Sequence, residues 1–295
     1  TYNVSGTAAE IAGASAAMMN SATDVTATGN ATVAQAATIY GFTNSGTTTY
    51  NISGTAADIL GAAAAVISSA NAIVVSDVSI TAAQATSIHA LNANSSYSVS
   101  GTAPAIVAAG AGVMDNAVNV TVTNTATVAQ AITIDAFGNT GTTTFSVSDT
   151  ATAILAGAAA AAMAAAASIT VTDSASAAQA ILIDGFAGTS TYSVSDTAAN
   201  ILAGGAAAAM ANATTITVTN PTISAANAIT IDAFAGTSIY SVSDVVANIV
   251  AGGAASAMSN ATSITVTNAV TAAQATTIHA FAGSSSYAVS DTVAN

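Results

Sequence analysis

Two histidines are the side chains of this sequence most suited to metal binding or proton transfer. His89 and His279 occupy one position of an internal repeat, at which four other repeats carry Tyr40, Asp135, Asp184 and Asp232. A zinc site needs three or four converging ligands. Because the two histidines lie four repeats apart, the position is interpreted as a variable, exposed one, and no zinc site is expected.

A second column of acidic residues recurs near the start of the later repeats. It consists of Asp149, Asp196, Asp244 and Asp291, and the first three repeats carry Gly6, Gly54 and Gly101 there. Exchange of Asp for Gly is typical of a helix N-cap or a turn, so capping is the favoured interpretation. Carboxylates without a counter-cation could also attract Ca²⁺, which takes several oxygen ligands. Calcium binding at these four aspartates is the alternative.

The composition argues against several classes of function. The 295 residues include no Lys or Arg and 13 acidic residues, which gives a formal net charge of −13. Nucleic acids and anionic membranes are therefore not expected partners, since Lys and Arg dominate their recognition. The chain also has no Cys, and neither histidine can be matched with a Ser and an Asp as a catalytic triad. We expect no enzyme activity and no cofactor.

The positions of these residues are set by a tandem repeat. An aromatic residue recurs at alternating intervals of 48 and 47 residues, at Tyr2, Tyr50, Tyr97, Phe145, Tyr192, Tyr240 and Tyr287. The sequence thus predicts a single solenoid over residues 1–295, with six repeats that start near 2, 50, 97, 145, 192 and 240 and the beginning of a seventh at 287.

Each repeat divides into two halves of about 24 residues. In the fifth, Tyr192 to Ser195 alternates apolar and polar residues like a strand, and Thr197 then caps an Ala-rich run, predicted as one long helix ending near Asn212. A second strand, Ile216 to Thr219, precedes a shorter helix ending near Phe234. This pattern predicts an α/β solenoid with a parallel sheet on one side and Ala-rich helices on the other. Whether one half or two make a coil stays open.

Two further columns are interpreted as structural. A Ser or Thr followed three residues later by Gln predicts a capping box at Thr32/Gln35, Thr81/Gln84, Thr127/Gln130, Ser176/Gln179 and Thr271/Gln274, with Ser224/Asn227 as the variant. Core packing is predicted for Met19, Met114, Met163, Met210 and Met258, with Ile67 in the remaining repeat.

Three segments carry a resemblance to known proteins: Ser195 to Ile201, Ile216 to Thr219 and Thr271 to Gln274. They resemble tandem repeats of large secreted bacterial surface proteins, the adhesin-like, type I secreted repeat arrays. The resemblance implies an extracellular or cell-surface location and a role in surface structure or adhesion. The chain departs from the calcium-binding nonapeptide pattern because it has no Gly-Gly-x-Gly-x-Asp segment. The calcium sites of that class are therefore not carried over.

The main functional hypothesis is a structural subunit of an extracellular bacterial filament or surface layer. Neither the strand at Tyr2 and Val4 nor the one at Tyr287 and Val289 belongs to a polar capping repeat, so these four residues are predicted to join copies head to tail into a homopolymer. The alternative is a stalk segment of a large adhesin. No membrane span is expected, because runs such as Ala158 to Ala167 are too short.

Two other hypotheses concern the exposed polar side chains. Threonine pairs that could bind ice occur at Thr121/Thr123, Thr170/Thr172, Thr217/Thr219 and Thr265/Thr267, although Thr is also expected there from its β-propensity. Asn-x-Ser/Thr sequons that could carry glycans begin at Asn3, Asn30, Asn51, Asn94, Asn119, Asn212 and Asn260.

Overall fold

The computed structural model describes residues 2–281 and 283–292. The chain divides into two compact units, Thr1–Ser146 and Val147–Asn295. The boundary lies within strand β7 (Thr143–Asp149), the first strand of the fourth repeat.

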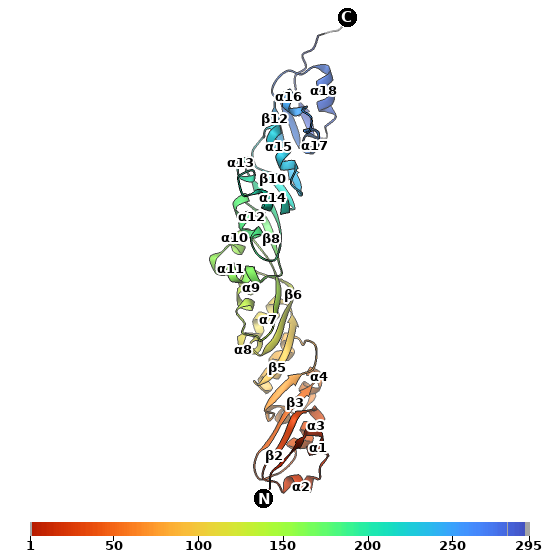
Figure 1. The fold of residues 1–295 in the computed structure, drawn as a ribbon, viewed down its shortest axis with the longest axis vertical. Coiled ribbons are helices and arrows are strands. Elements are labelled where there is room, and N and C mark those ends of the chain that lie inside the picture. Colours follow the sequence, from red (N-terminus) through yellow and green to blue (C-terminus); the bar gives the residue numbers. More distant parts are fainter. Residues whose placement is uncertain (1, 282, 293–295) are drawn as a thin grey trace. The chain divides into compact units, whose positions relative to one another are not determined.

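Alternating strands and helices make up the first unit (Figure 1). Its strands are β1 (Val4–Thr7), β2 (Val25–Ala31), β3 (Thr48–Gly54), β4 (Ala72–Val75), β5 (Ser95–Gly101), β6 (Ala117–Ala126) and the start of β7. Its helices are α1 (Ala8–Gly13), α2 (Ala16–Asn20), α3 (Val33–Tyr40), α4 (Ala56–Gly61), α5 (Ala64–Ser68), α6 (Ala82–Leu91), α7 (Ala103–Ala109), α8 (Ala111–Met114) and α9 (Val128–Asp135).

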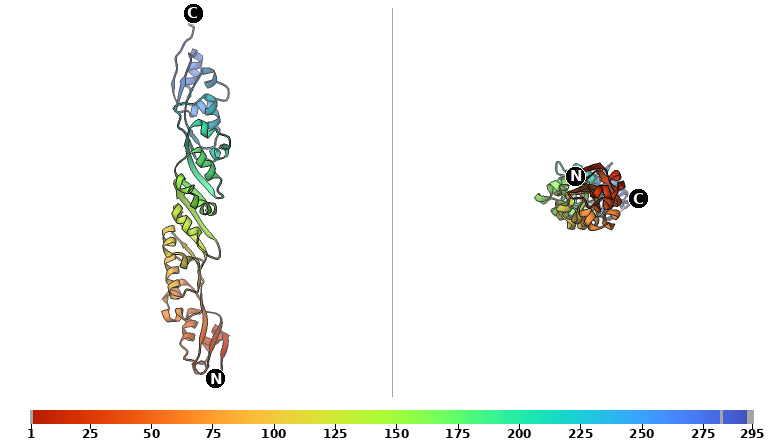
Figure 2. Two further views of the ribbon diagram at one scale, coloured as in Figure 1. Left: turned by 90° about the vertical axis from the view of Figure 1, so that its left-hand side faces the viewer. Right: turned by 90° about the horizontal axis from the view of Figure 1, so that it is seen from below.

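The second unit has the same alternation (Figure 2). Its strands are β8 (Ser168–Ala175), β9 (Thr189–Asp196), β10 (Thr215–Val218), β11 (Thr237–Ile239), β12 (Ser241–Asp244), β13 (Ser263–Val266) and β14 (Ser284–Ser286). Its helices are α10 (Ala151–Ile154), η1 (Gly157–Ala159), α11 (Ala160–Ala165), α12 (Ala177–Asp184), α13 (Ala198–Ile201), α14 (Ala207–Asn212), α15 (Ala225–Asp232), α16 (Val246–Ile249), α17 (Ala255–Asn260) and α18 (Ala272–His279).

The strands follow one another in chain order, which confirms the predicted parallel α/β solenoid. β1 to β11 form one sheet and β12 to β14 a second. Adjacent strands are parallel, as in the pairing of β9 with β10, where Val194 lies opposite Ile216. Two strands separate equivalent points of consecutive repeats, so each repeat adds about 10 Å along the sheet.

In the first and fourth repeats, the second strand, β2 or β8, contains a β-bulge. In β2 and β3, the four-residue step from Thr26 to Asn30 lies opposite the two-residue step from Thr49 to Asn51. β8 repeats this arrangement between Thr170 and Ser174. The extra residues have no partner in the ladder with the following strand, which is the usual effect of a bulge.

The predicted long helix is wrong, because two short helices replace it. In the fifth repeat α13 ends at Ile201 and α14 begins at Ala207. Gly205, with φ +94°, lies between them in a conformation that strongly favours glycine. The break allows both Ile201 and Met210, each 0 % exposed, to face the core, although an Ala-rich run favours a continuous helix.

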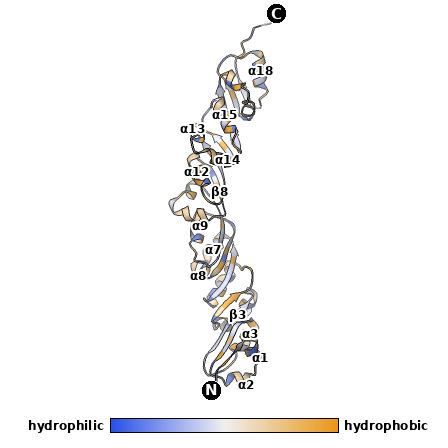
Figure 3. Ribbon diagram, in the orientation of Figure 1, coloured by the Kyte–Doolittle hydropathy of each residue, from blue (hydrophilic) through white to orange (hydrophobic). Residues whose placement is uncertain are grey.

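One face of each sheet is buried under helices, and the other carries the polar residues of the alternating pattern. In β9, Tyr192 and Val194 are buried, whereas Ser193 and Ser195 on the opposite face are only half-buried. The predicted core columns are confirmed: the five methionines and Ile67 are all at most 1 % exposed. Hydrophobic and hydrophilic residues are accordingly interspersed along both units (Figure 3).

A glycine column allows consecutive coils to approach closely. A Cβ atom added at Gly236 would lie 2.2 Å from the carbonyl oxygen of Ala213, and one at Gly188 would lie 2.4 Å from that of Ala166. Real Cβ atoms do not approach backbone oxygens so closely, so these positions require glycine. The same close approach occurs at Gly46, Gly141 and Gly283.

Candidate functional site

The aspartate column joins consecutive coils. Asp196, at the end of β9, accepts a hydrogen bond through Oδ2 from the N–H of Ala177, the first residue of α12, at 3.0 Å. Its Oδ1 accepts from the N–H of Thr197 and the Nδ2 of Asn200, both at 2.7 Å. The side chain thus caps a helix of the preceding repeat while it orders the turn into α13.

Asp244 has the same three kinds of partner. It accepts from the N–H of Ala225 at 3.0 Å and from Val245 and Asn248 at 2.8 Å each. Burial raises the pKa of Asp244, but the hydrogen bonds from these three residues outweigh it and leave the pKa below the usual value for Asp. The pKa of Asp196 is lowered by the corresponding balance. Both carboxylates are therefore stabilised in their ionised form.

The other members of the column also accept hydrogen bonds from the backbone. Asp291 accepts from Ala272 at 2.9 Å and from Thr292 at 2.8 Å, and Asp149 accepts from Thr150 at 2.8 Å. Within residues 2–281 and 283–292, no group of three His, Asp or Glu side chains is placed to hold a metal ion. Asp196, Asp244 and Asp291 thus cap helices in this structure, and calcium binding at the four aspartates stays an untested alternative.

A second column of caps, which the sequence did not predict, lies in or just after the second strand of the repeats. The Oδ1 of Asp173 accepts from the N–H of Ala151, the first residue of α10, at 2.8 Å. In the equivalent contacts, a side-chain oxygen accepts a hydrogen bond from the first N–H of a helix: Asp77 from Ala56, Asn124 from Ala103, Asn220 from Ala198 and Asn268 from Val246. The alternation of Asp and Asn at one position was the available signal, because these residues share one oxygen acceptor geometry.

The histidine column does not form one site. His89, in α6, has its Nδ1 2.9 Å from the Nδ2 of Asn116, and His279 ends α18. Asp184 and Asp232, at the same repeat position, instead lie 3.0 Å from the hydroxyl of Tyr192 and 3.1 Å from that of Tyr240. Each hydroxyl shares its single proton between the carboxylate and a helix carbonyl, that of Ala209 or Ala257.

Of the predicted self-assembly residues, Val4 begins β1 and Tyr2 precedes it, while Tyr287 and Val289 follow β14. Tyr2 is 45 % exposed and Val289 is 56 % exposed, while Val4 and Tyr287 are half-buried. Every other aromatic residue of the column is between 1 % and 2 % exposed: Tyr50, Tyr97, Phe145, Tyr192 and Tyr240. The buried tyrosine hydroxyls donate to helix carbonyls, as Tyr50 does to Val66 at 2.7 Å.

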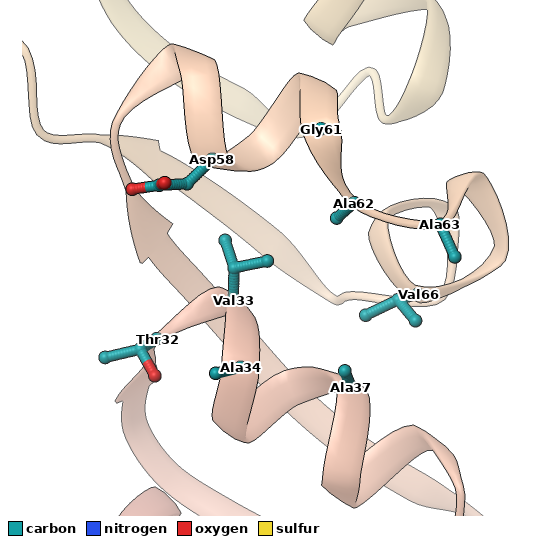
Figure 4. Close-up of a pocket in the computed structure, with 9 residues that line it drawn as sticks. All are labelled: Thr32, Val33, Ala34, Ala37, Asp58, Gly61, Ala62, Ala63 and Val66. Atoms are coloured by element: carbon teal, nitrogen blue, oxygen red, sulfur yellow. The ribbon is translucent and has the colours of Figure 1, made fainter.

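A groove of ≈ 480 Å³ lies between α3 and the α4–α5 pair in the first unit (Figure 4). Small apolar side chains, including Val33, Ala37 and Ala63, line most of it, and Asp58 lies at one end. Helices α6 and α7 form an equivalent groove of ≈ 340 Å³ one repeat later. The recurrence shows that these grooves result from the packing of small helices and are not a single specialised site.

The threonine pairs lie on or beside the helix-free face of the sheets. In the ladders, Thr217 lies opposite Ser195 and Thr265 lies opposite Ser243. Thr217 lies opposite Ile239 on its other side, and Thr170 lies opposite Thr191, so the hydroxyl groups do not form a uniform threonine lattice.

No protein-family model, no curated protein and no solved structure matches the chain. Across the part of the chain that the structure describes, no helix is both long enough and apolar enough to cross a membrane.

Proposed function

We propose that the chain is a structural subunit of an extracellular bacterial filament or surface layer. Copies join head to tail when the edge strand β1 of one copy pairs with the extended segment Tyr287 to Ser290 of another. The small fraction of charged residues, 4%, and the resemblance to secreted repeat arrays support the extracellular location.

The observation that carries this proposal is the exposure of Tyr2. Its ring occupies the column in which five other aromatic rings are nearly inaccessible to solvent, yet 45 % of Tyr2 is exposed. β1 pairs with β2 along one edge, from Val4 opposite Val25 to Thr7 opposite Thr28. An added strand at the other edge would pair with the backbone of β1 and cover the ring of Tyr2, and both changes favour association.

This contact would be head to tail, so it would grow as an open fibre unless its rotation closed a ring. The junction contains no basic residue and needs no ion pair. Salt should weaken it little and should help by screening the repulsion between chains that carry 13 negative charges each.

Electron microscopy of the purified protein at low and high ionic strength tests the proposal. We expect fibres, with more at high salt. Tyr2→Ser should abolish them, whereas Tyr40→Ser should not, because Tyr40 is equally exposed, at 43 %, but lies outside the column. Monodisperse single chains at both salt concentrations would instead support the stalk of a large adhesin.

A further inference from the structure

Two polar pockets in the second unit have the same composition in consecutive repeats. One, of ≈ 350 Å³, is lined by Asp184, Gly188, Thr189, Ser190 and Asn212. The other, of ≈ 400 Å³, has Asp232, Gly236, Thr237, Ser238 and Asn260 at the equivalent positions, together with Phe234. A carboxylate, a carboxamide and two hydroxyl groups therefore converge in each pocket.

The carboxylate is held in a fixed orientation. In the first pocket, Oδ1 of Asp184 accepts from the Nδ2 of Asn212 at 2.9 Å and lies 3.0 Å from the hydroxyl of Tyr192, whose single proton is shared with the carbonyl oxygen of Ala209 at 2.8 Å. No donor among the described residues reaches its Oδ2. In the second pocket, Asn260 donates to Oδ1 of Asp232 at 2.9 Å, and Ser256 donates to Oδ2 at 2.8 Å. Each carboxylate oxygen can accept two hydrogen bonds, so acceptor capacity is left for a ligand.

This arrangement selects a ligand by its hydrogen-bonding groups. The carboxylate can accept from ligand hydroxyl groups with charge-assisted strength. The Oδ1 of the asparagine and the side chains of Thr189 or Thr237 add further donors and acceptors, while the half-buried ring of Phe234 offers a surface for an apolar C–H face. An anionic ligand is disfavoured, because each pocket contains a carboxylate and the chain has no Lys or Arg.

We infer that these two pockets bind a neutral saccharide, and that together they bind a neutral polysaccharide. The repeat places equivalent pockets two strands apart, which is roughly 10 Å along the sheet. A single sugar chain can therefore occupy both pockets at once. The second contact is then intramolecular, so a polymer binds more tightly than a mono- or disaccharide without any new type of contact.

Isothermal titration calorimetry and NMR titration with cellohexaose, maltohexaose and mannohexaose test this inference, with hexagalacturonate as the anionic probe. At least one neutral hexasaccharide should bind saturably and more tightly than its own disaccharide, and hexagalacturonate should bind more weakly. The double variant Asp184→Ala/Asp232→Ala should lose about tenfold or more in affinity, as expected for charge-assisted hydrogen bonds. Each single variant should reduce the hexasaccharide affinity toward that of the disaccharide.

Asp135→Ala is the matched control, because Asp135 has the same repeat position but lines neither pocket. It should bind like the unmodified protein. If the double aspartate variant fails to fold, Asn212→Ala/Asn260→Ala replaces it, since both asparagines are exposed. Binding of none of the neutral probes would overturn the inference. So would equal binding of hexagalacturonate, or neutral binding that neither double variant weakens.

Discussion

Among single residues, Gln179 is the one whose substitution tests the predicted capping boxes. The N–H of Ser176 donates to Oε1 of Gln179 at 2.9 Å, and the N–H of Gln179 donates to Oγ of Ser176 at 3.2 Å. We predict that Gln179→Ala lowers the free energy of unfolding by about 0.5–1 kcal/mol, the usual contribution of a cap. Urea denaturation measures this change.

Gln179→Glu is the control, because Glu10 closes the same box with Thr7 in α1. It should retain most of the stability. A loss as large as that of the alanine variant would contradict the reciprocal hydrogen bonds.

Gly236 tests the close approach of consecutive coils. Gly236→Ala would place a Cβ atom 2.2 Å from the oxygen of Ala213, so the backbone must shift. We predict a loss of roughly 2 kcal/mol in unfolding free energy, typical of overpacking. In the control, Gly204→Ala, the new Cβ has nothing within 4 Å and should cost little. Equal losses from the two variants, measured by thermal unfolding, would exclude a special role for Gly236.

At the level of strands and helices, the aspartate caps make the free energy of unfolding depend on pH in the acidic range. The folded pKa values of Asp196 and Asp244 are lowered, so their contribution is present above the unfolded pKa of about 3.8 and is lost as pH falls through the folded value. We predict that Asp196→Asn/Asp244→Asn lowers the free energy of unfolding by about 1 kcal/mol at neutral pH, since the sites are only half-buried and solvent weakens the charged hydrogen bonds.

Urea titrations between neutral pH and pH of about 3 measure this effect. The double variant should lose less stability on acidification than the unmodified protein. Asp135→Asn is the control, because among the described residues no donor reaches the Asp135 carboxylate, and it should leave the acid dependence unchanged. Parallel pH profiles for all three proteins would contradict the inter-coil caps.

The sequence predicted the strands and short helices better than it predicted the helix break and the contacts between coils. Period-two alternation and the Thr/Gln spacing indicated the strands and the short helix correctly, because both depend on local geometry. The break between α13 and α14 was missed, because the helix propensity of alanine outweighed the glycine signal in the pattern. The Asp173 cap was missed because its partner, the N–H of Ala151, belongs to an element 22 residues earlier, so the contact depends on how the coils pack.

At the scale of the whole molecule, the tyrosine column predicts an alkaline limit to stability. Burial raises the pKa of Tyr50 and of Tyr97 to about 12, and the pKa values of Tyr192 and Tyr240 are also raised, first by burial and then by nearby Asp side chains. A raised folded pKa contributes stability that is complete below the unfolded value of about 10 and is lost as pH rises toward 12.

Circular dichroism and tyrosinate absorbance, followed across this range, should therefore show unfolding and ionisation together. Tyr97→Phe should ionise one group fewer and should shift the unfolding transition to higher pH, as Phe145 already lacks a hydroxyl in this column. Ionisation of the buried tyrosines without loss of structure would contradict the prediction.

Head-to-tail pairing of strands is the central claim, and disulfide trapping tests it most directly. The chain has no Cys, so an introduced pair has no competing thiol. Ser5 lies in β1, and Ser290, in the segment that follows β14, donates its N–H to the carbonyl of Val270. Neighbouring parallel strands lie about 4.8 Å apart, within the Cα separation that a disulfide can span.

The measurement is a non-reducing gel of oxidised Ser5→Cys/Ser290→Cys. We predict a ladder that extends beyond dimers and collapses on reduction, while either single variant stops at dimers and Ser100→Cys/Ser290→Cys, whose first position pairs internally with Thr121, forms no ladder. If the Ser5→Cys/Ser290→Cys protein stays monomeric under oxidation, head-to-tail pairing through these strands is wrong.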